Sequence, residues 1–477
     1  MGYRLQMSEE VHGWLAGYVE ALGGAERTGG HPGPHRRVHD EERGHPWWRA
    51  TRSPTSSVSS SGAPVRWPRL PGRSCAVPNP TVPAAPTSTS ADLPGDRQLR
   101  PASEAAAEFG PFGGRAWFNT AHQGPLPRAA VAASQHAAQL KAAPHLLRDE
   151  DFRDVPERLR QLLADLVGGS PEQVVLGNST SYGLHLIANG LDWQPGDEVL
   201  TIDGDYPATV LPWRRLEPAG VAVRAVRPAG DQLSPDQLVA EIGPRTRLVA
   251  VTWVDSFTGR ALDLDGLGAV CRRAGVLLIV NASQALGARP IDVGATPVDA
   301  VVSCGYKWLC GPYGTGFAWL DQGLLDRLRP QQAYWLAMQA GRGLDQMRGT
   351  TVRDDLGVRA FDVFCPAAFA STLPWIAALQ VFLATGVPAI AGHDQHLADR
   401  LLDGLDPGQY ELISPHTGPA RSTLVVLARR DGTAEARHRQ LTEAGLDTAY
   451  REGNLRLSLH LFNTPAEIDR ALTLLHA

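Results

Sequence analysis

From about Ala116 onward, the chain alternates short apolar runs with stretches of helical periodicity. Strands buried on both faces read as continuous apolar runs, and strands that alternate with helices form a mostly parallel sheet. The expected strands span residues 174–177, 198–203, 248–254, 276–280 and 300–303, with helices such as 181–190 and 264–274 between them. This pattern predicts an α/β fold with a doubly wound, mostly parallel sheet.

After about Arg359 the chain reads as a smaller α+β unit. A long helix is expected at 374–385, followed by a strand at 422–428, a helix at 434–444, a strand at 455–460 and a helix at 465–475. We therefore expect a large domain over residues 105–355 and a small C-terminal domain over 356–477.

The first hundred residues differ from the rest. They hold 12 of the 37 prolines, and only residues 9–22 show a helical period. Such a segment cannot bury enough apolar surface to offset its ordering entropy. We expect residues 1–104 to be disordered or to form an extension outside the folded enzyme, with a functional tail as the alternative.

The net charge and the cysteine content indicate which partners, sites and compartment to expect. The net charge of −5 does not favour nucleic acid or an acidic membrane as a partner, and no apolar run approaches the roughly 20 residues of a membrane helix. The five cysteines have no C-x-x-C spacing, so neither a disulfide framework nor a metal site is expected. A reducing, cytoplasmic compartment fits best.

The strongest chemical signal is the segment around Lys307. This lysine follows an apolar strand and precedes a glycine-rich turn, Gly311-Pro312-Tyr313-Gly314-Thr315-Gly316. Ligands bind at the carboxyl ends of strands in open α/β sheets, and a lysine there can condense with an aldehyde cofactor. Taken alone, Lys307 could equally be a surface lysine after a buried strand.

Three further segments end strands with polar groups. They are Asn281-Ala282-Ser283-Gln284, Gly177-Asn178-Ser179-Thr180-Ser181 and Asp205-Tyr206-Pro207. Hydroxyls and free N–H groups at a helix start form a phosphate cradle, although a simple N-cap is the alternative. Tyr206 could cover a flat cofactor or lie in the core.

Together these segments resemble the class V aminotransferases, which are fold type I pyridoxal-phosphate enzymes. The group includes cysteine desulfurases, kynureninase, isopenicillin N epimerase and the C–S lyases of ergothioneine assembly. The resemblance runs from about Phe118 to the C-terminus. It includes Arg456-Leu457-Ser458-Leu459-His460-Leu461-Phe462-Asn463-Thr464, which is similar to the family's R-x-S-x-H-x-Y-N-T ending.

The resemblance implies a role for each matching residue around the cofactor. Lys307 would hold pyridoxal phosphate as a Schiff base and move the Cα proton. Gln284 would contact the phenolic oxygen, and Tyr206 would stack on the ring. The phosphate would be bound by the group that comprises Thr180, Ser181, Tyr306 and Ser303, with Cys304 as the alternative to Ser303.

The resemblance also implies a substrate site for a small amino acid, in an enzyme that forms a homodimer. Arg456 would bind the substrate α-carboxylate, with Arg451 as a weaker candidate. The segment 118–125, which contains Asn119 and His122, would line the substrate pocket. A structural histidine is the alternative for His122.

The chain departs from the family pattern in its charges and its cysteines. Asn281 stands where the family has an aspartate that keeps the pyridine nitrogen protonated, so we expect a neutral nitrogen and a weaker electron sink. No cysteine lies beyond Cys365, which makes persulfide transfer on the protein improbable. Cys365 itself occupies the place of a threonine that reaches the partner subunit's phosphate.

These features favour cleavage at Cβ of a cysteine-like amino acid, a C–S β-lyase reaction of secondary metabolism. An aminotransferase or an epimerase similar to isopenicillin N epimerase is the next alternative. A cofactor-binding pseudoenzyme is the alternative from another class, because Asn281 weakens the sink.

Overall fold

The computed structural model describes residues 99–338, 348 and 351–477, all of which belong to one compact unit, Ser90–Ala477. The helix expected at 9–22, and most of the extension expected over 1–104, lie outside the described residues. The folded chain begins earlier than predicted. Arg100 N donates to Ala384 O at 2.8 Å, and helix α2 (Ala102–Ala106) buries Ala105 completely.

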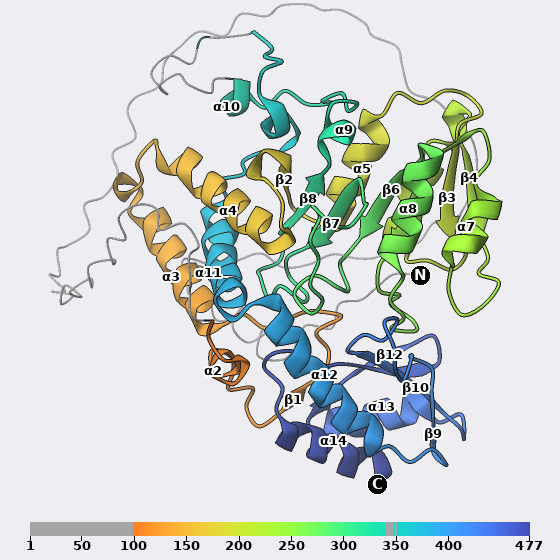
Figure 1. Ribbon diagram of the computed structural model, residues 1–477. Coiled ribbons are helices and arrows are strands. Elements are labelled where there is room, and N and C mark those ends of the chain that lie inside the picture. The colour runs from red at the N-terminus through yellow and green to blue at the C-terminus, as the bar shows by residue number, and fades with distance from the viewer. Residues whose placement is uncertain (1–98, 339–347, 349–350) are drawn as a thin grey trace, which may run out of the picture. The chain divides into compact units, whose positions relative to one another are not determined.

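A seven-stranded sheet organises the larger part of the fold (Figure 1). Only β8 runs against its two neighbours, so the sheet is mostly parallel, as predicted. The order across the sheet is β2 (Val174–Gly177), β8 (Gly316–Leu320), β7 (Ala300–Cys304), β6 (Leu277–Asn281), β5 (Thr246–Thr252), β3 (Glu198–Ile202) and β4 (Ala222–Val226).

Helices cover both faces of this sheet, which confirms the doubly wound α/β prediction. One apolar core lies under α4 (Asp151–Val167), α7 (Pro235–Glu241), α8 (Leu264–Ala274) and α11 (Phe369–Thr385). The second lies under α5 (Thr180–Gly190), α6 (Pro207–Arg214) and α9 (Gln322–Leu325). Helix α3 (Arg128–Ala142) packs on α11, and α10 (Trp335–Met338) follows α9.

The C-terminal part has its own four-stranded antiparallel sheet, in the order β12-β13-β10-β9. Its core contains Leu457, Leu427 and Leu397, all fully buried. The elements are α12 (Val387–Asp403), β9 (Tyr410–Leu412), β10 (Leu424–Arg429), α13 (Ala434–Glu443), β11 (Leu446–Asp447), β12 (Ala449–Arg451), β13 (Asn454–Ser458) and α14 (Pro465–His476).

The division between the two parts differs from the predicted boundaries at both ends. Strand β1 (Ala116–Trp117) pairs with β11, so the start of the predicted large domain packs with the C-terminal part. Helix α11 packs on α3 and α4 of the large part, and the chain turns at Gly386, whose φ is 82°. Helix α11 therefore packs with the large part of the fold, although the predicted small domain includes it.

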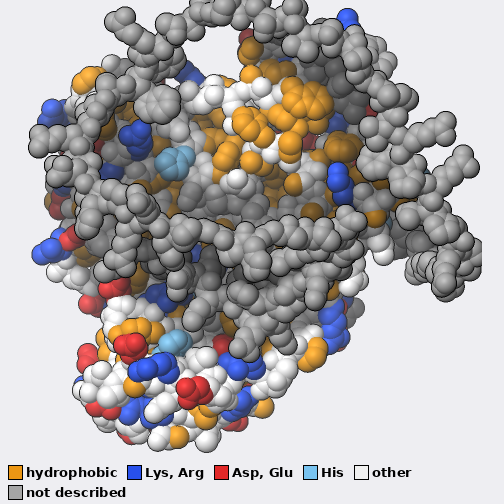
Figure 2. All heavy atoms as spheres, turned by 180° about the vertical axis from the view of Figure 1, so that it is seen from behind, with side chains coloured by type: hydrophobic (Ala, Val, Ile, Leu, Met, Phe, Trp, Pro, Cys, Tyr) orange, Lys and Arg blue, Asp and Glu red, His pale blue; other side chains and the backbone are white. Residues whose placement is uncertain are grey.

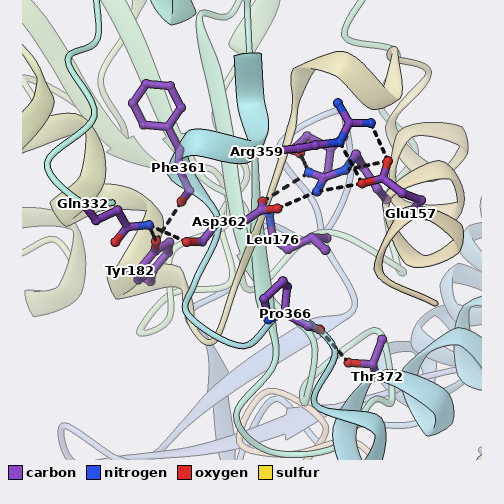
Figure 3. A network of polar contacts seen from close by, with 11 residues as sticks. Glu157, Leu176, Tyr182, Gln332, Arg359, Phe361, Asp362, Pro366 and Thr372 are labelled. Carbon is purple, nitrogen blue, oxygen red and sulfur yellow. Dashed lines mark hydrogen bonds and ion pairs between the residues drawn. The ribbon is translucent and has the colours of Figure 1, made fainter. Parts of the chain in front are cut away.

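A buried polar network ties the segment before α11 to the large sheet (Figure 3). Arg160 Nη2 of α4 lies 2.6 Å from Asp362 Oδ2, and Leu176 N of β2 donates to Asp362 Oδ1 at 2.8 Å. Arg359 and Glu157 form a more exposed pair at 2.6 Å beside them. Asp362 thus anchors the loop that carries Cys365, which is exposed and has a positive φ of 57°.

The upper and lower parts of the surface seen in Figure 2 differ in the kind of side chain that they expose. Hydrophobic side chains gather on the upper part of that face, while charged side chains of both signs are spread over the lower part. Among the described residues no single helix is long and apolar enough to cross a membrane; α11 and α12, bent by 79°, meet that test only as a pair.

Candidate active site

Lys307 lies just after β7, in a pocket of about 500 Å³ at the carboxyl end of the parallel strands. Its side chain is buried, with a relative exposure of 9%. Within the described part of the chain, no carboxylate pairs with its Nζ and no acceptor hydrogen-bonds to it. Such an amine fits a lysine that bonds to an aldehyde carbon.

Two aromatic rings flank the Lys307 amine. Its Nζ lies 5.6 Å from the centre of the Tyr206 ring and 5.9 Å from that of Tyr306. Tyr206 follows β3 and is 39% exposed, so one face of its ring is open to the pocket. The predicted stacking position of Tyr206 therefore has the room that a flat ring needs.

The segment 118–125 packs directly on the lysine loop. Gly124 N donates to Tyr306 O at 2.9 Å, and a Cβ at Gly124 would lie 2.1 Å from Lys307 O. Only glycine allows this approach. This close contact of segment 118–125 with the lysine loop brings His122 and Gln123 into the lining of the pocket.

Arg456 of β13 brings a second buried cation into the same pocket. Its side chain is 5% exposed, and its one hydrogen bond goes from Nη1 to Ser256 O at 3.2 Å. The Nε atom is buried without a partner. Burial and the nearby Arg451 lower the pKa of Arg456 to about 10. Because neither Asp nor Glu lines the described pocket, Arg456 suits an anionic ligand such as a carboxylate.

His122 and Arg451 also line the pocket. Burial lowers the pKa of His122, and the charges of Arg451, Arg456 and Lys307 lower it further. His122 is therefore neutral at pH 7 and can accept a proton. Among the residues that the structure describes, Arg451 Nη1 hydrogen-bonds only to the carbonyl of Tyr450, at 2.8 Å, so its charge is also available to a ligand.

Asn119 does not reach the pocket lining. Its backbone forms a bridge with Ser458, and its buried Oδ1 has no hydrogen-bond partner. The structure therefore places Asn119 behind His122, against the C-terminal sheet, and does not bring it together with the other predicted substrate residues.

The predicted phosphate cradle lies at the start of α5 (Thr180–Gly190). Ser179 caps the helix by accepting from Tyr182 N at 3.1 Å, which leaves the N–H groups of Thr180 and Ser181 pointing out of the helix end. A Cβ at Gly316 of β8 would lie 2.6 Å from the Ser179 backbone, so glycine permits this close approach. The Thr180 hydroxyl, however, contacts Ser283 Oγ at 2.6 Å and faces the core.

Strand alternation favours Cys304 over Ser303 at this cradle. Ser303 Oγ donates only to the Cys304 carbonyl, at 3.2 Å. Val302 lies on the same side of β7 as Cys304. Its side chain packs against Gly183 of α5, so closely that a Cβ at Gly183 would lie 2.5 Å from it. Cys304 therefore faces the α5 side. Its thiol also contacts Tyr306, whose pKa is raised to about 12 by burial and by Cys304, so this phenol stays a donor.

Asn281 is the last residue of β6 and does not itself line the pocket, whereas Gln284 follows the strand. Gln284 lines the pocket. Asn281 is buried and its amide is hydrogen-bonded: Nδ2 donates to Thr209 Oγ1 at 2.8 Å, and Oδ1 accepts from Ser283. The charge of the family aspartate is absent at this position.

Sequence reasoning missed several lining residues. Ser256 and Phe257 come from the loop after β5, and Tyr313 comes from the glycine-rich turn. The Phe257 ring centre lies 6.4 Å from that of Tyr206. The loop after β5 carried a usable signal, because it also follows a strand at its carboxyl end. No group of His, Cys, Asp and Glu among the described residues could hold a metal ion.

Comparisons with known proteins agree with this geometry. The model of the family "Aminotransferase class-V" matches residues 125–471. Isopenicillin N epimerase of Streptomyces clavuligerus is 30% identical over 383 residues, which cover 75% of this chain and 94% of that protein. A probable cysteine desulfurase of Methanothermobacter thermautotrophicus is 27% identical over 344 residues, 66% of this chain and 81% of the other.

Solved structures share the fold. The complex between the cystine C–S lyase C-DES and its reaction product cysteine persulfide superposes with a TM-score of 0.69. The identity is 23%, and the match covers 76% of this chain and 97% of the lyase. An apo cysteine desulfurase from Thermococcus onnurineus has a TM-score of 0.70 at 19% identity, over 79% of this chain and 98% of that one.

Proposed function

This chain belongs to the aminotransferase class-V family of pyridoxal-phosphate enzymes, and on that premise we propose that it cleaves the Cβ–S bond of a cysteine-like amino acid. One observation carries the proposal. Lys307 and Arg456 line the same pocket, and each is a buried cation without a carboxylate partner among the described residues.

The residues present fit pyridoxal phosphate. Lys307 would bond its aldehyde carbon, Tyr206 would lie on the ring, and the N–H groups of Thr180 and Ser181 would bind the phosphate. When bound, the cofactor supplies an electron sink for a carbanion at Cα.

The protein's own groups position and deprotonate the substrate. Arg456 binds the α-carboxylate, which fixes the rotation of the amino acid about its Cα bonds. Lys307 Nζ would be the base that takes the Cα proton. The rings of Tyr206 and Tyr306 keep water away from that amine.

The proposed β-elimination balances as follows. The Cα proton goes to Lys307, the Cα–H electron pair forms the Cα–Cβ double bond, and the Cβ–S bond breaks with its electrons on sulfur. Sulfur leaves as a thiol after protonation. Hydrolysis of the unsaturated product consumes one water and yields a keto acid and ammonia, and no oxidant or reductant is needed.

Two features support elimination over transamination. Asn281 provides no negative charge to hold a proton on the ring nitrogen, and a weaker sink favours a reaction in which the carbanion is lost quickly. No cysteine lines the described pocket, so sulfur would leave on a small molecule.

Epimerisation at Cα is the second candidate. It is supported by the similarity to isopenicillin N epimerase and by His122, a neutral base in the same pocket as Lys307. Two bases in one pocket could remove and return the Cα proton on different sides.

We also propose a cytoplasmic homodimer. Large aromatic side chains are exposed in the single chain: Tyr313, which lines the pocket, by 67%, and Phe364 by 56%. A second subunit would cover such a surface.

Product analysis separates these reactions. The holoenzyme is incubated with cystine and with S-substituted cysteines in deuterated water. A lyase releases stoichiometric keto acid, ammonia and thiol or persulfide. An epimerase releases none of them and incorporates deuterium at Cα of both enantiomers. Amino-acid-dependent loss of the cofactor's visible absorbance, restored by a keto acid, would instead identify a transaminase and contradict both proposals.

A further inference from the structure

We propose that Asp205 sets the direction of a buried hydrogen-bond chain that makes the Asn281 amide a hydrogen-bond donor toward the cofactor's ring nitrogen. The chain links Asp205 to Asn281 through Thr252 and Thr209. The proposal rests on the cofactor but not on which reaction follows, so it can fail independently of the lyase proposal.

The orientation of the Asn281 amide follows from its neighbours. Ser283 N can only donate, and it lies 3.1 Å from Asn281 Oδ1, so this atom is the carbonyl oxygen. The Ser283 hydroxyl donates to the same oxygen at 2.6 Å. The Nδ2 group therefore faces Thr209, at 2.8 Å.

The direction continues away from Asn281. Thr209 Oγ1 accepts from Asn281 and lies 2.8 Å from Thr252 Oγ1, where Thr209 must be the donor if the one hydroxyl hydrogen of Thr252 is used elsewhere. Thr252 then donates its hydroxyl hydrogen to the Asp205 carboxylate, which also accepts from Thr252 N at 3.0 Å. A carboxylate has no hydrogen to return, so the chain ends there.

The same logic extends the chain toward the phosphate cradle. The one hydrogen of Ser283 Oγ is used on Asn281, so Thr180 must be the donor in its 2.6 Å contact with Ser283. Thr180 therefore has no hydroxyl hydrogen for a phosphate, and of its two predicted donors only the backbone N–H remains. This corrects the hydroxyl role expected for Thr180.

The orientation of the Asn281 amide determines which form of the cofactor's ring nitrogen it can bind. Asn281 Nδ2 has a second hydrogen, and no described residue accepts it. An amide N–H can bind a ring nitrogen only when that nitrogen carries a lone pair and no proton. The negative charge missing from position 281 is therefore held at Asp205, at the far end of the chain, where it polarises each donor in turn.

Placing a second carboxylate at position 281 would disrupt the chain. In Asn281→Asp, Thr209 would donate to the new carboxylate while Thr252 still donates to Asp205. The two threonine oxygens, 2.8 Å apart, would then face each other without a hydrogen. In the double variant with Asp205→Asn, the new amide can donate to the Thr252 hydroxyl and the whole chain can reverse. The loss of one of the two backbone N–H bonds that Asp205 accepts is common to the single and the double variant, so it cancels in the comparison.

A double-mutant cycle on the apoprotein tests this coupling. We expect Asn281→Asp to lower Tm by about 3 °C in the native background, from the loss of one buried hydrogen bond. In the Asp205→Asn background the same substitution should cost less than about 1 °C. Additive shifts would overturn the proposal. Thr209→Val, which removes the hydroxyl, should lower Tm as much as Asn281→Asp does. Thr209→Ser, which keeps the hydroxyl, should not lower Tm in this way.

Nitrogen-15 NMR of ring-labelled pyridoxal phosphate, bound to each variant, gives a second readout. The native protein should show an unprotonated pyridine nitrogen at neutral pH, and the double variant Asp205→Asn with Asn281→Asp should show a protonated one. A protonated nitrogen in the native protein would overturn the proposal, whatever the protein does to its substrate.

Discussion

Trp308 Nε1 donates a hydrogen bond to Gln284 Oε1 at 2.8 Å, and this contact fixes which end of the Gln284 amide faces the cofactor. The amide nitrogen donates to Ala121 O at 3.1 Å and keeps one hydrogen for the pocket. The backbone carbonyl of Trp308 is hydrogen-bonded to His460 Nε2 at 2.8 Å. His460 Nδ1 in turn lies 2.8 Å from Asp394 Oδ2. Gln284 therefore offers an N–H donor, which suits the cofactor's phenolic oxygen.

Trp308→Phe should weaken cofactor binding because the Gln284 amide is then free to turn its oxygen toward the pocket. The loss of one neutral hydrogen bond predicts about a fivefold higher Kd, measured by titrating apoprotein with pyridoxal phosphate. Gln284→Glu, which replaces the donor by a negative acceptor, should have a larger effect. Equal Kd values for Trp308→Phe and the native protein would contradict this role.

Arg456→Gln should lower kcat/KM about 100-fold, because the substrate carboxylate loses its buried charged partner. Arg451→Gln is the matched control. Arg451 is exposed and contacts only a backbone carbonyl, so its loss should cost less than about fivefold. Cofactor absorbance should be unchanged in both. Equal losses in the two variants would contradict the assignment of Arg456.

Asp362→Asn should destabilise the protein by about 3 kcal/mol, because it removes the buried carboxylate nearest the Arg160 guanidinium and leaves only the longer contact with the partly exposed Glu157. Arg359→Gln, which breaks only the exposed pair with Glu157, should cost at most about 1 kcal/mol. Chemical denaturation measures both. If the two variants lose similar stability, the network in Figure 3 does not anchor this loop as described.

The stability of the apoprotein should carry a signature of Asp205 at mildly acidic pH. Burial raises the pKa of Asp205 from 3.8 to about 6. Between these values the folded protein keeps a proton that the unfolded chain has lost, so the free energy of unfolding falls as pH rises through this window. Asp205→Asn should flatten that slope. An unchanged slope would show that the Asp205 pKa is not raised.

The strands that carry the site were predictable because they are buried on both faces and read as continuous apolar runs. Strands β2, β6 and β7 lie within one or two residues of their predicted bounds. Helix α11 begins at Phe369, five residues before its predicted start at Pro374, because that proline lies inside the helix although proline is typical of a helix's first turn. Helix α12 was missed altogether.

The contacts between residues of different sequence segments were not predictable from the sequence. Lys307, Gln284 and Arg456 each sit in a recognisable segment, and the structure brings all three to one pocket. Thr209 and Thr252 carry no such signal, because a threonine in a helix or strand is ordinary. Their contact at 2.8 Å joins residues 43 positions apart and depends on how α6 packs against β5.

The central claim is that Lys307 bonds pyridoxal phosphate in this pocket. Visible absorption of the purified protein, before and after borohydride, tests it beside Lys307→Ala and the surface control Lys141→Ala. We expect a yellow protein that borohydride bleaches, with the cofactor then fixed to the Lys307 peptide by mass spectrometry. Lys141→Ala should behave the same and Lys307→Ala should not. A colourless native protein that takes up no added pyridoxal phosphate, or a cofactor fixed to another lysine, would contradict the claim.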